Sequence, residues 1–388
     1  MSGAGQFAAV GWSPAVRRMV WGLSVAGVVA LPLGLAWVGA RTWVSWLLAS
    51  QYLIQVGVSG AVLVALLYAS GATWGVAFRR VPESLCALLP IGAAGFMLLL
   101  LVHPAVYPWI HDPVGGPFKR WWLAWPFFTG RAAAYLAAWI GLTTLMLRVS
   151  RRQDVTGDLA DSALNTRLAA LFLGVFAVTF SLSAFDWIMS LEPEWYSTIF
   201  AAQVFAGTLL AGLAATTVGV SVLQRAGPLR DTLTPSHLHD LGKLLFGMST
   251  FWMYLWFSQY MLIWYANIPE EAIYYVRRFD GPLWPLVLLT VALNWIVPFV
   301  VLMPRRAKRH PPVMFAVAVT VLVGHWVDLH VMIVPSASDA SLWPSVLDVA
   351  ISLGAIGLAI GVVTHALNRS PIVPVGDPGL AESLHYHS

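Results

Sequence analysis

The chain has 388 residues, of which 59% are hydrophobic and only 10% carry a formal charge, and its mean hydropathy is +0.74. This composition excludes an ordinary soluble globular protein and is typical of an integral membrane protein. The net charge of +4 comes from cations in the expected loops and gives no reason to expect a nucleic-acid partner.

Apolar runs of about 20 residues, the length that crosses a hydrocarbon core of roughly 30 Å, recur along the chain. Because a backbone in lipid must satisfy its own hydrogen bonds, we expect these runs to be helices. The sequence predicts ten transmembrane helices, over residues 20–40, 53–77, 85–107, 132–149, 168–190, 198–223, 241–266, 283–303, 313–334 and 345–367.

The expected fold class is therefore all-α, a polytopic membrane protein. The ten-helix domain covers 20–367 and lies between an N-terminal segment, 1–19, and a C-terminal tail, 368–388. The tail contains several prolines, and we expect it to be irregular and exposed. Fifteen of the 22 Lys and Arg residues fall on the side of the two termini. The positive-inside rule then predicts a multi-pass protein with both termini in the cytoplasm.

The stretch 108–131 is the longest segment that we expect outside the membrane. It is rich in Pro, Gly and Trp, which predicts an interfacial loop anchored by aromatic rings. The single cysteine, Cys86, excludes an internal disulfide, a Cys-ligated iron–sulfur cluster and a CxxCH haem site. We expect it to be a small buried residue.

Asp186 ends the apolar run that starts at Leu168, and a carboxylate at membrane depth is costly and rare. Such groups usually face a bundle interior or a water-filled cavity, so Asp186 marks a candidate path for protons, ions or a polar head group. The alternative is a carboxylate that already reaches water at the end of its helix.

His325 and Asp328 are three residues apart in the ninth run, so they can contact one another on one helix face. A His–carboxylate pair in a membrane is a candidate proton relay. The alternative is a structural pair that pins neighbouring helices.

Further polar residues fall mostly in the outer half of the predicted membrane, where they could contact a polar ligand or carry protons. No continuous ladder of titratable residues is evident in the inner half. Each one alone is better explained as a helix–helix hydrogen bond than as a functional group. These residues are His103, Gln203, Tyr254, Gln259 and Asn294. A bis-His haem on His103 and His330 is conceivable by depth alone, and no His/Glu group has metal-ligand spacing.

Two passages carry a family resemblance. One is SAFDWIMSLEPEWYSTIF at 183–200; the other starts with LHDLGKLLF at 238 and continues through FSQY at 257–260 and IWYANIPEE at 263–271. Both resemble the NrfD-like family, whose members are similar to the membrane subunit of polysulfide reductase. Within it they look closest to the second, smaller membrane subunit of alternative complex III, the bacterial quinol:cytochrome c oxidoreductase.

This resemblance implies two four-helix bundles with peripheral helices in a bacterial inner membrane. It also implies a place in a respiratory electron-transport chain. No cofactor would be bound covalently; a quinone or quinol is the candidate ligand, and haem and Fe–S centres would lie in partner subunits. The implied partners are an Fe–S/molybdopterin-like subunit, a larger NrfD-like paralogue, c-type cytochrome subunits and lipid, with a terminal oxidase as a further candidate. Asp186 and Gln259 belong to the matching strings.

Three functions remain open on this basis. The first is a subunit that supplies a quinone-associated site or a proton half-channel for quinol oxidation. The second is a purely structural paralogue that holds the complex together. The third is an ion-coupled transporter, which the lack of helices broken at mid-depth disfavours.

Overall fold

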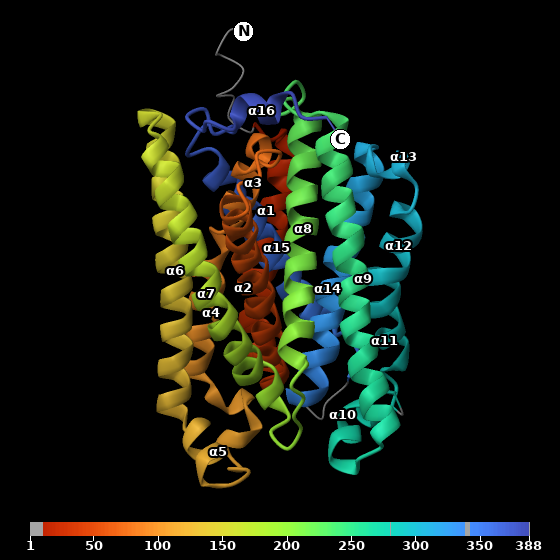
Figure 1. Ribbon diagram of the computed structural model, residues 1–388. Coiled ribbons are helices and arrows are strands. Elements are labelled where there is room, and N and C mark those ends of the chain that lie inside the picture. The colour runs from red at the N-terminus through yellow and green to blue at the C-terminus, as the bar shows by residue number, and fades with distance from the viewer. Residues whose placement is uncertain (1–10, 280, 338–341, 388) are drawn as a thin grey trace.

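The structure, a computed structural model, describes residues 11–279, 281–337 and 342–387. Throughout these ranges the regular structure is helical, and the long helices run side by side in one bundle (Figure 1). The helices are α1 (Pro14–Trp37), α2 (Ala40–Ala69), α3 (Arg80–Leu85), α4 (Leu88–Val102), α5 (Pro117–Trp122), α6 (Trp125–Thr156), α7 (Leu159–Trp187), α8 (Phe200–Ala226), α9 (Pro235–Ala266), α10 (Pro269–Phe279), α11 (Trp284–Val291), α12 (Val297–Leu302), α13 (Arg305–Lys308), α14 (Pro311–Ala337), α15 (Val346–Leu367) and α16 (Leu380–Leu384). A π-helical segment, Ala292–Ile296, joins α11 to α12. Helices α13 and α16 lie at one end of the bundle, called here the α16 end, and α5 and α10 lie at the opposite, α10 end (Figure 1).

Nine helical segments of the described chain are long and apolar enough to cross a membrane. They confirm a polytopic, all-α membrane protein and overlap nine of the ten predicted helices. Helix α9 overlaps the remaining prediction, 241–266, and is not one of the nine. Its first turns contain His239, Asp240 and Lys243, and the rest of the helix is rich in Trp and Tyr. These residues lower the mean hydropathy of α9.

The predicted start of the second helix at residue 53 is wrong, because α2 begins at Ala40. Arg41 suggested a loop, since an unpaired cation disfavours a membrane helix. In the structure Arg41 is buried, and its Nη2 lies 2.7 Å from Oδ2 of Asp348 on α15. The Asp348 carboxylate also accepts a hydrogen bond at 2.7 Å from the backbone N–H of Ser345, the N-cap residue of α15. The ion pair therefore allows α2 to extend through the position of the arginine.

Two groups of helices surround two main hydrophobic cores. Helix α2 packs against α4 and α7, and α6 packs against α7. On the other side α8 packs against α9 and α14, while α14 contacts α11 and α9 contacts α12. Helices α2 and α8 pack against each other and join the groups. Cys86 is buried, as expected.

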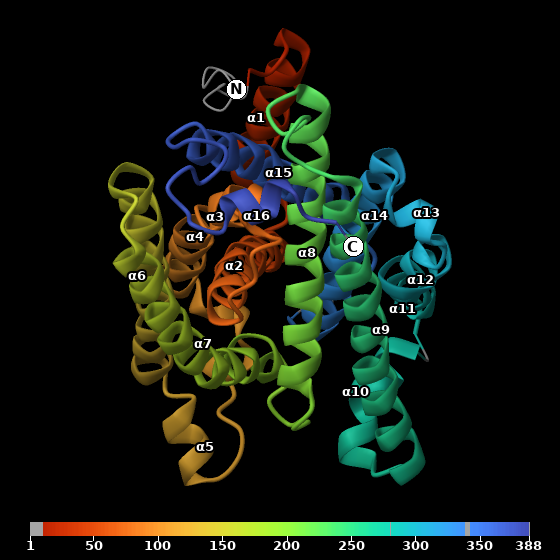
Figure 2. The ribbon, with the colours of Figure 1, turned by 45° about the horizontal axis from the view of Figure 1, so that its top comes forward.

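Helix α1 is peripheral and is held chiefly by α15 (Figure 2). The two helices cross at Gly27 and Gly354, where a Cβ added to Gly27 would lie 2.5 Å from the Cα of Gly354. A side chain at either position would push the backbones apart. Most of the remaining surface of α1 is exposed in the isolated chain, with Trp21 and Val28 more than 70% exposed.

The expectation of an exposed C-terminal tail is wrong. Asp377 pairs with Arg79, whose Nη1 lies 2.7 Å from its Oδ2. Ser383 is fully buried and donates to the carbonyl of Trp74 at 3.0 Å. The tail therefore crosses the α16 end of the bundle and is packed there by an ion pair and by buried hydrogen bonds.

Candidate functional site

Asp186 lies in the last turn of α7 and is only 2% exposed, so it does not reach water directly. It accepts hydrogen bonds from Nε and Nη2 of Arg131 at 3.1 and 3.0 Å, and from the indole of Trp122 at 2.8 Å. Both carboxylate oxygens are therefore held by donors. The ion pair joins α6 to α7, and its two-point geometry is that of a firmly held pair.

Arg131 was expected just outside a helix starting at 132, and this expectation is wrong because α6 begins at Trp125. The guanidinium stacks over the rings of Trp122 and Phe127, 4.0 and 4.4 Å from their centroids. Aromatic faces and a carboxylate together compensate a buried cation. The i, i+4 spacing of Phe127 and Arg131 is the sequence signal that could have indicated that Arg131 lies in a helix and stacks on an aromatic ring.

Asp328, on α14, has a different environment. It is 4% exposed and accepts a hydrogen bond from the indole N–H of Trp252 at 3.3 Å. No salt bridge to Asp328 occurs among the described residues. A neutral donor leaves both the charged and the protonated carboxyl accessible, whereas an arginine would favour the charged form.

A small cavity of about 20 Å³ adjoins Asp328. It is lined by Gln203, Trp256, Tyr274, Tyr275, Arg278, Phe279, Val287, Asp328, Val331 and Met332. A polar cavity needs roughly 10–15 Å³ to hold one water molecule. The space beside Asp328 therefore admits about one water and is far too small for a quinone ring.

A chain of hydrogen bonds leads away from this cavity. Gln259 donates its amide N–H to the hydroxyl of Tyr275 at 3.1 Å, and its carbonyl accepts from Ser197 at 3.3 Å. Because the Tyr275 oxygen accepts from Gln259, its own O–H remains available for the cavity. Burial raises the pKa of Tyr275, so the phenol keeps its proton at neutral pH. Gln259 was expected at the site, whereas Tyr275 was not.

Arg278 lines the same cavity and was also missed, since the sequence suggested a loop cation. It is 2% exposed, and its Nη1 donates to Glu192 at 2.9 Å. The other N–H groups reach Ser336 at 2.8 Å and the backbone carbonyls of α10 and α14. Glu192 is therefore held beside the cavity through Arg278 and accepts from Ser336 at 2.6 Å.

His325 and Asp328, expected as a pair, are not joined by a hydrogen bond in the described structure. The His325 ring packs instead against Tyr52, with ring centroids 5.6 Å apart. Its Nε2 is buried and has no hydrogen-bond partner among the described residues. The two side chains thus point to different neighbours despite their i, i+3 spacing.

Other expected residues lie apart from the Asp328 cavity. His103 ends α4 and stacks on Trp43 with centroids 4.9 Å apart, and burial lowers the pKa of His103. Tyr254 is 64% exposed on the outer surface of α9. Asn294 lies in the π-helical segment, where it donates to the carbonyl of Thr290 at 3.1 Å.

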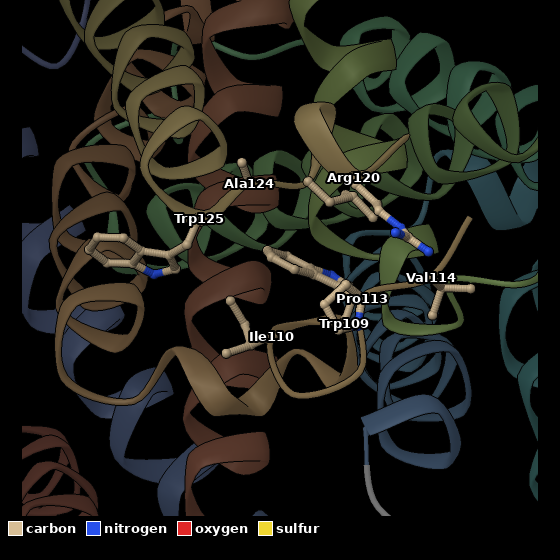
Figure 3. A pocket seen from close by; sticks show the side chains of 8 residues that line it. Trp109, Ile110, Pro113, Val114, Arg120, Ala124 and Trp125 are labelled. Atoms are coloured by element: carbon tan, nitrogen blue, oxygen red, sulfur yellow. The ribbon is translucent and has the colours of Figure 1, made fainter. Parts of the chain in front are cut away.

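A second cavity, of about 250 Å³, lies in the segment expected as an interfacial loop (Figure 3). Trp109 lies at its centre, with Trp125 to one side and Arg120 to the other (Figure 3). The remaining lining residues are Ile110, Pro113, Val114, Leu123 and Ala124. Its size, unlike that of the first cavity, approaches the lower range of small-molecule sites.

At the α16 end, a cluster of buried charges contains groups that the sequence placed in loops. Glu83 pairs with Arg79 and with Arg80, and it accepts from Ser150 at 2.8 Å. Arg80 also pairs with Asp154 of α6. These side chains lie at the opposite end of the bundle from α10, and the cations neutralise the carboxylates.

Comparisons with known proteins add no assignment: no protein-family model matches this chain, and no curated protein matches its sequence.

Proposed function

We propose that this chain is an integral membrane subunit of a bacterial respiratory quinol:cytochrome c oxidoreductase of the alternative-complex-III type, and that its own task is proton transfer. The resemblance of residues 183–200 and 238–271 supports the assignment to the complex. The observation that carries the proposed proton transfer is Asp328: a buried carboxylate, held by the neutral indole of Trp252, beside room for one water. A carboxyl group in such a site can exist in either protonation state.

The proposal adds α9 as a tenth membrane helix and places both termini in the cytoplasm. The α10 end then faces outward. Two four-helix bundles are supported by the packing of α2, α4, α6 and α7 on one side and α8, α9, α11–α12 and α14 on the other. Helices α1 and α15 are then peripheral. The polar groups around Asp328 lie near α10, as an outward-facing half-channel requires.

Oxidation of a quinol releases electrons and protons, and this chain's residues would act on the protons. The Asp328 carboxylate would accept a quinol-derived proton through the cavity water, and its protonated form would then release that proton toward the α10 end, which the proposal places outside. The Tyr275 hydroxyl can donate a hydrogen bond to that water while Gln259 holds its oxygen. Electrons would leave through haem and Fe–S centres of partner subunits.

A direct quinone contact at Asp328 is disfavoured by volume. The cavity of about 20 Å³ cannot hold a ring, whereas the outer cavity beside Trp109 has about 250 Å³. If this subunit binds a quinone, the outer cavity is the better location. Asp186 accepts a hydrogen bond from Trp122, which directly precedes the lining residues Leu123 and Ala124 in the chain, and it would then help to hold that segment in place.

A structural role is the second candidate, and a specific observation favours it. Among the buried ion pairs that join separate elements are Arg41–Asp348, Arg131–Asp186 and Arg278–Glu192. In each of these pairs the polar groups are well hydrogen-bonded, as expected for ion pairs that fix the positions of neighbouring helices. The Asp328 site is the feature that a scaffold alone does not require.

The test is Asp328→Asn in the intact complex, which removes the titratable proton and keeps the shape. We expect quinol:cytochrome c turnover and proton release to fall at least tenfold while haem content and subunit composition stay normal. Asp112→Asn, at an exposed carboxylate, is the control and should leave both unchanged. Normal turnover and proton release in assembled Asp328→Asn would instead favour the structural role. Ion transport by the isolated chain in liposomes would favour a transporter.

A further inference from the structure

The C-terminal tail closes over a histidine at the α16 end. His237 lies in the first turn of α9, before the apolar span 241–266, and it is fully buried. Its ring is edge-on to Phe78, with centroids 6.2 Å apart, and tilted against Tyr386 of the tail, with centroids 5.5 Å apart. The chain runs from α16 across to the start of α9 (Figure 1). His237 is therefore enclosed between the bundle and the tail.

The hydrogen bonding of His237 indicates its protonation state. The backbone N–H of Thr234 donates to Nδ1 of the ring at 3.0 Å, so Nδ1 carries no proton. The neutral ring then has its proton on Nε2. A second proton would have to be added at Nδ1, the atom that accepts from Thr234. The imidazolium form is thus incompatible with this hydrogen bond.

The turn that contains His237 also holds the tail. Thr234 and His237 are the N-cap and N3 residues of a capping box that starts α9. The Thr234 hydroxyl donates to the backbone carbonyl of Tyr386 at 2.9 Å. The Tyr386 phenol donates to the carboxylate of Asp240, one turn further along α9. Two contacts of the tail therefore depend on the geometry of this first turn.

Charged groups near the ring act in both directions. The Asp240 carboxylate favours the imidazolium form of His237, and His387 of the tail opposes it. Asp240 is itself paired with Lys243 and hydrogen-bonded by the Tyr386 phenol. Burial has the largest effect and lowers the pKa of His237.

On the other side of the ring the chain leads to buried charges that the tail covers. Phe78 presents an apolar face to His237, and the next residue, Arg79, pairs with Asp377 of the tail at 2.7 Å. Arg79 also pairs with Glu83. The charge of Arg79 is therefore compensated where it lies, and the tail supplies one of its two carboxylate partners.

We propose that protonation of His237 releases the end of the tail, residues 377–387, from the α16 end of the bundle. A proton at Nδ1 removes the acceptor of the Thr234 N–H and leaves a charge in an enclosed site, and both effects oppose docking of the tail. Release would uncover Arg79 and Glu83. The proposal is independent of any proton transfer at Asp328.

The direction of the pH dependence follows from burial. A histidine in the undocked tail contact titrates near its ordinary pKa of about 6.5, and the docked one titrates at lower pH. Docking is therefore strongest above about pH 6.5 and weakens as the pH falls below that value.

The test is hydrogen–deuterium exchange of the full chain in detergent at about pH 7.5 and about pH 5.5, with rates corrected for the intrinsic effect of pH. The undocked fraction of the tail should rise about tenfold at the lower pH, which is one unit below the ordinary pKa of histidine. Exchange in the middle of α8 should stay unchanged. Equal protection of the wild-type tail at both pH values, or loss of protection throughout α8 together with the tail, would overturn the proposal.

Two variants assign the response to one histidine. His237→Gln removes the titration and keeps a residue that suits the N3 position of a capping box, so its tail should stay docked at both pH values. His239→Gln/His385→Gln/His387→Gln removes neighbouring histidines and should respond like wild type. A response that survives His237→Gln, or one that is lost in the triple variant, contradicts the proposal. If His237→Gln does not fold, the triple variant decides alone, because it either keeps the response or loses it.

Discussion

The indole N–H of Trp252 on α9 donates to the carboxylate of Asp328 on α14 across 3.3 Å. Asp186, another buried carboxylate near the α10 end, is instead held by the Arg131 guanidinium at 3.0 and 3.1 Å. The two aspartates are both nearly inaccessible to solvent, so burial does not distinguish them. The two aspartates differ in the charge of their hydrogen-bond partner. A cation stabilises the charged carboxylate, whereas a neutral indole leaves both protonation states accessible.

Replacing Trp252 by Phe keeps an aromatic ring and removes the hydrogen-bond donor. Hydrogen bonds to charged groups contribute about 1.5–3 kcal/mol, so we expect proton release and turnover to fall by roughly tenfold or more. Trp256→Phe is the matched control, since Trp256 also lines the cavity and, among the described residues, donates no hydrogen bond to the carboxylate. Equal effects of the two substitutions on proton release in the assembled complex would assign the loss to packing.

Asp186→Asn should destabilise the protein, because it leaves the buried Arg131 without its counter-charge. Breaking a buried pair by removing one partner costs about 3–5 kcal/mol. The double variant Asp186→Asn/Arg131→Gln should recover part of this loss, which thermal unfolding in detergent can measure as a coupling energy. Arg120→Gln, at an exposed arginine in the same region, is the control. Additive effects of the two single substitutions would show that the pair contributes little.

Tyr275→Phe removes the hydroxyl that Gln259 positions at the cavity. Because burial raises the pKa of Tyr275, its phenol is neutral throughout the range from about pH 6 to 9. The loss in turnover should therefore be several-fold and the same at every pH in this range. Quinol:cytochrome c turnover of the variant and the wild type, measured across that pH range, checks this expectation. An effect that appears only at alkaline pH would indicate that Tyr275 itself ionises.

Deleting the tail after Arg369 should lower the melting temperature by several degrees, because it uncovers Arg79 and removes the buried Ser383. Asp377→Asn alone should reproduce part of the effect through the lost ion pair. Glu382→Gln, at an exposed position of α16, should be neutral. Equal thermal stability of the truncated and full chains would show that the tail contributes no net binding energy.

Gly27→Leu should detach α1 from α15, since the two backbones leave no room for a side chain at their crossing. We expect faster proteolysis of α1 and a lower melting temperature. Gly22→Leu is the control, because nothing lies within 4 Å of a Cβ at that position. Similar behaviour of the two variants would mean that α1 adjusts its packing.

Much of the fold followed from periodicity and hydropathy alone. Every predicted membrane helix overlaps a helix of the described chain, because lipid leaves an apolar run of this length few alternatives to a helix. The predicted starts of two helices were wrong because a charged residue lies near the true start of each. Arg41 and Arg131 were placed outside helices, since the sequence does not show that Asp348 and Asp186 neutralise them.

Composition and apolar runs were enough to identify a helical membrane protein and to mark Asp186 and Asp328 as unusual carboxylates. Which of the two has a cation as its partner depends on how the helices pack. Arg131 and Asp186 come from separate helices, as do Trp252 and Asp328. Such contacts depend on how helices rotate and cross, and small residues and side-chain packing set that geometry. The period of a single helix puts His325 and Asp328 on one face of α14, but it does not say which neighbours their side chains contact, and His325 packs against Tyr52 instead of pairing with Asp328.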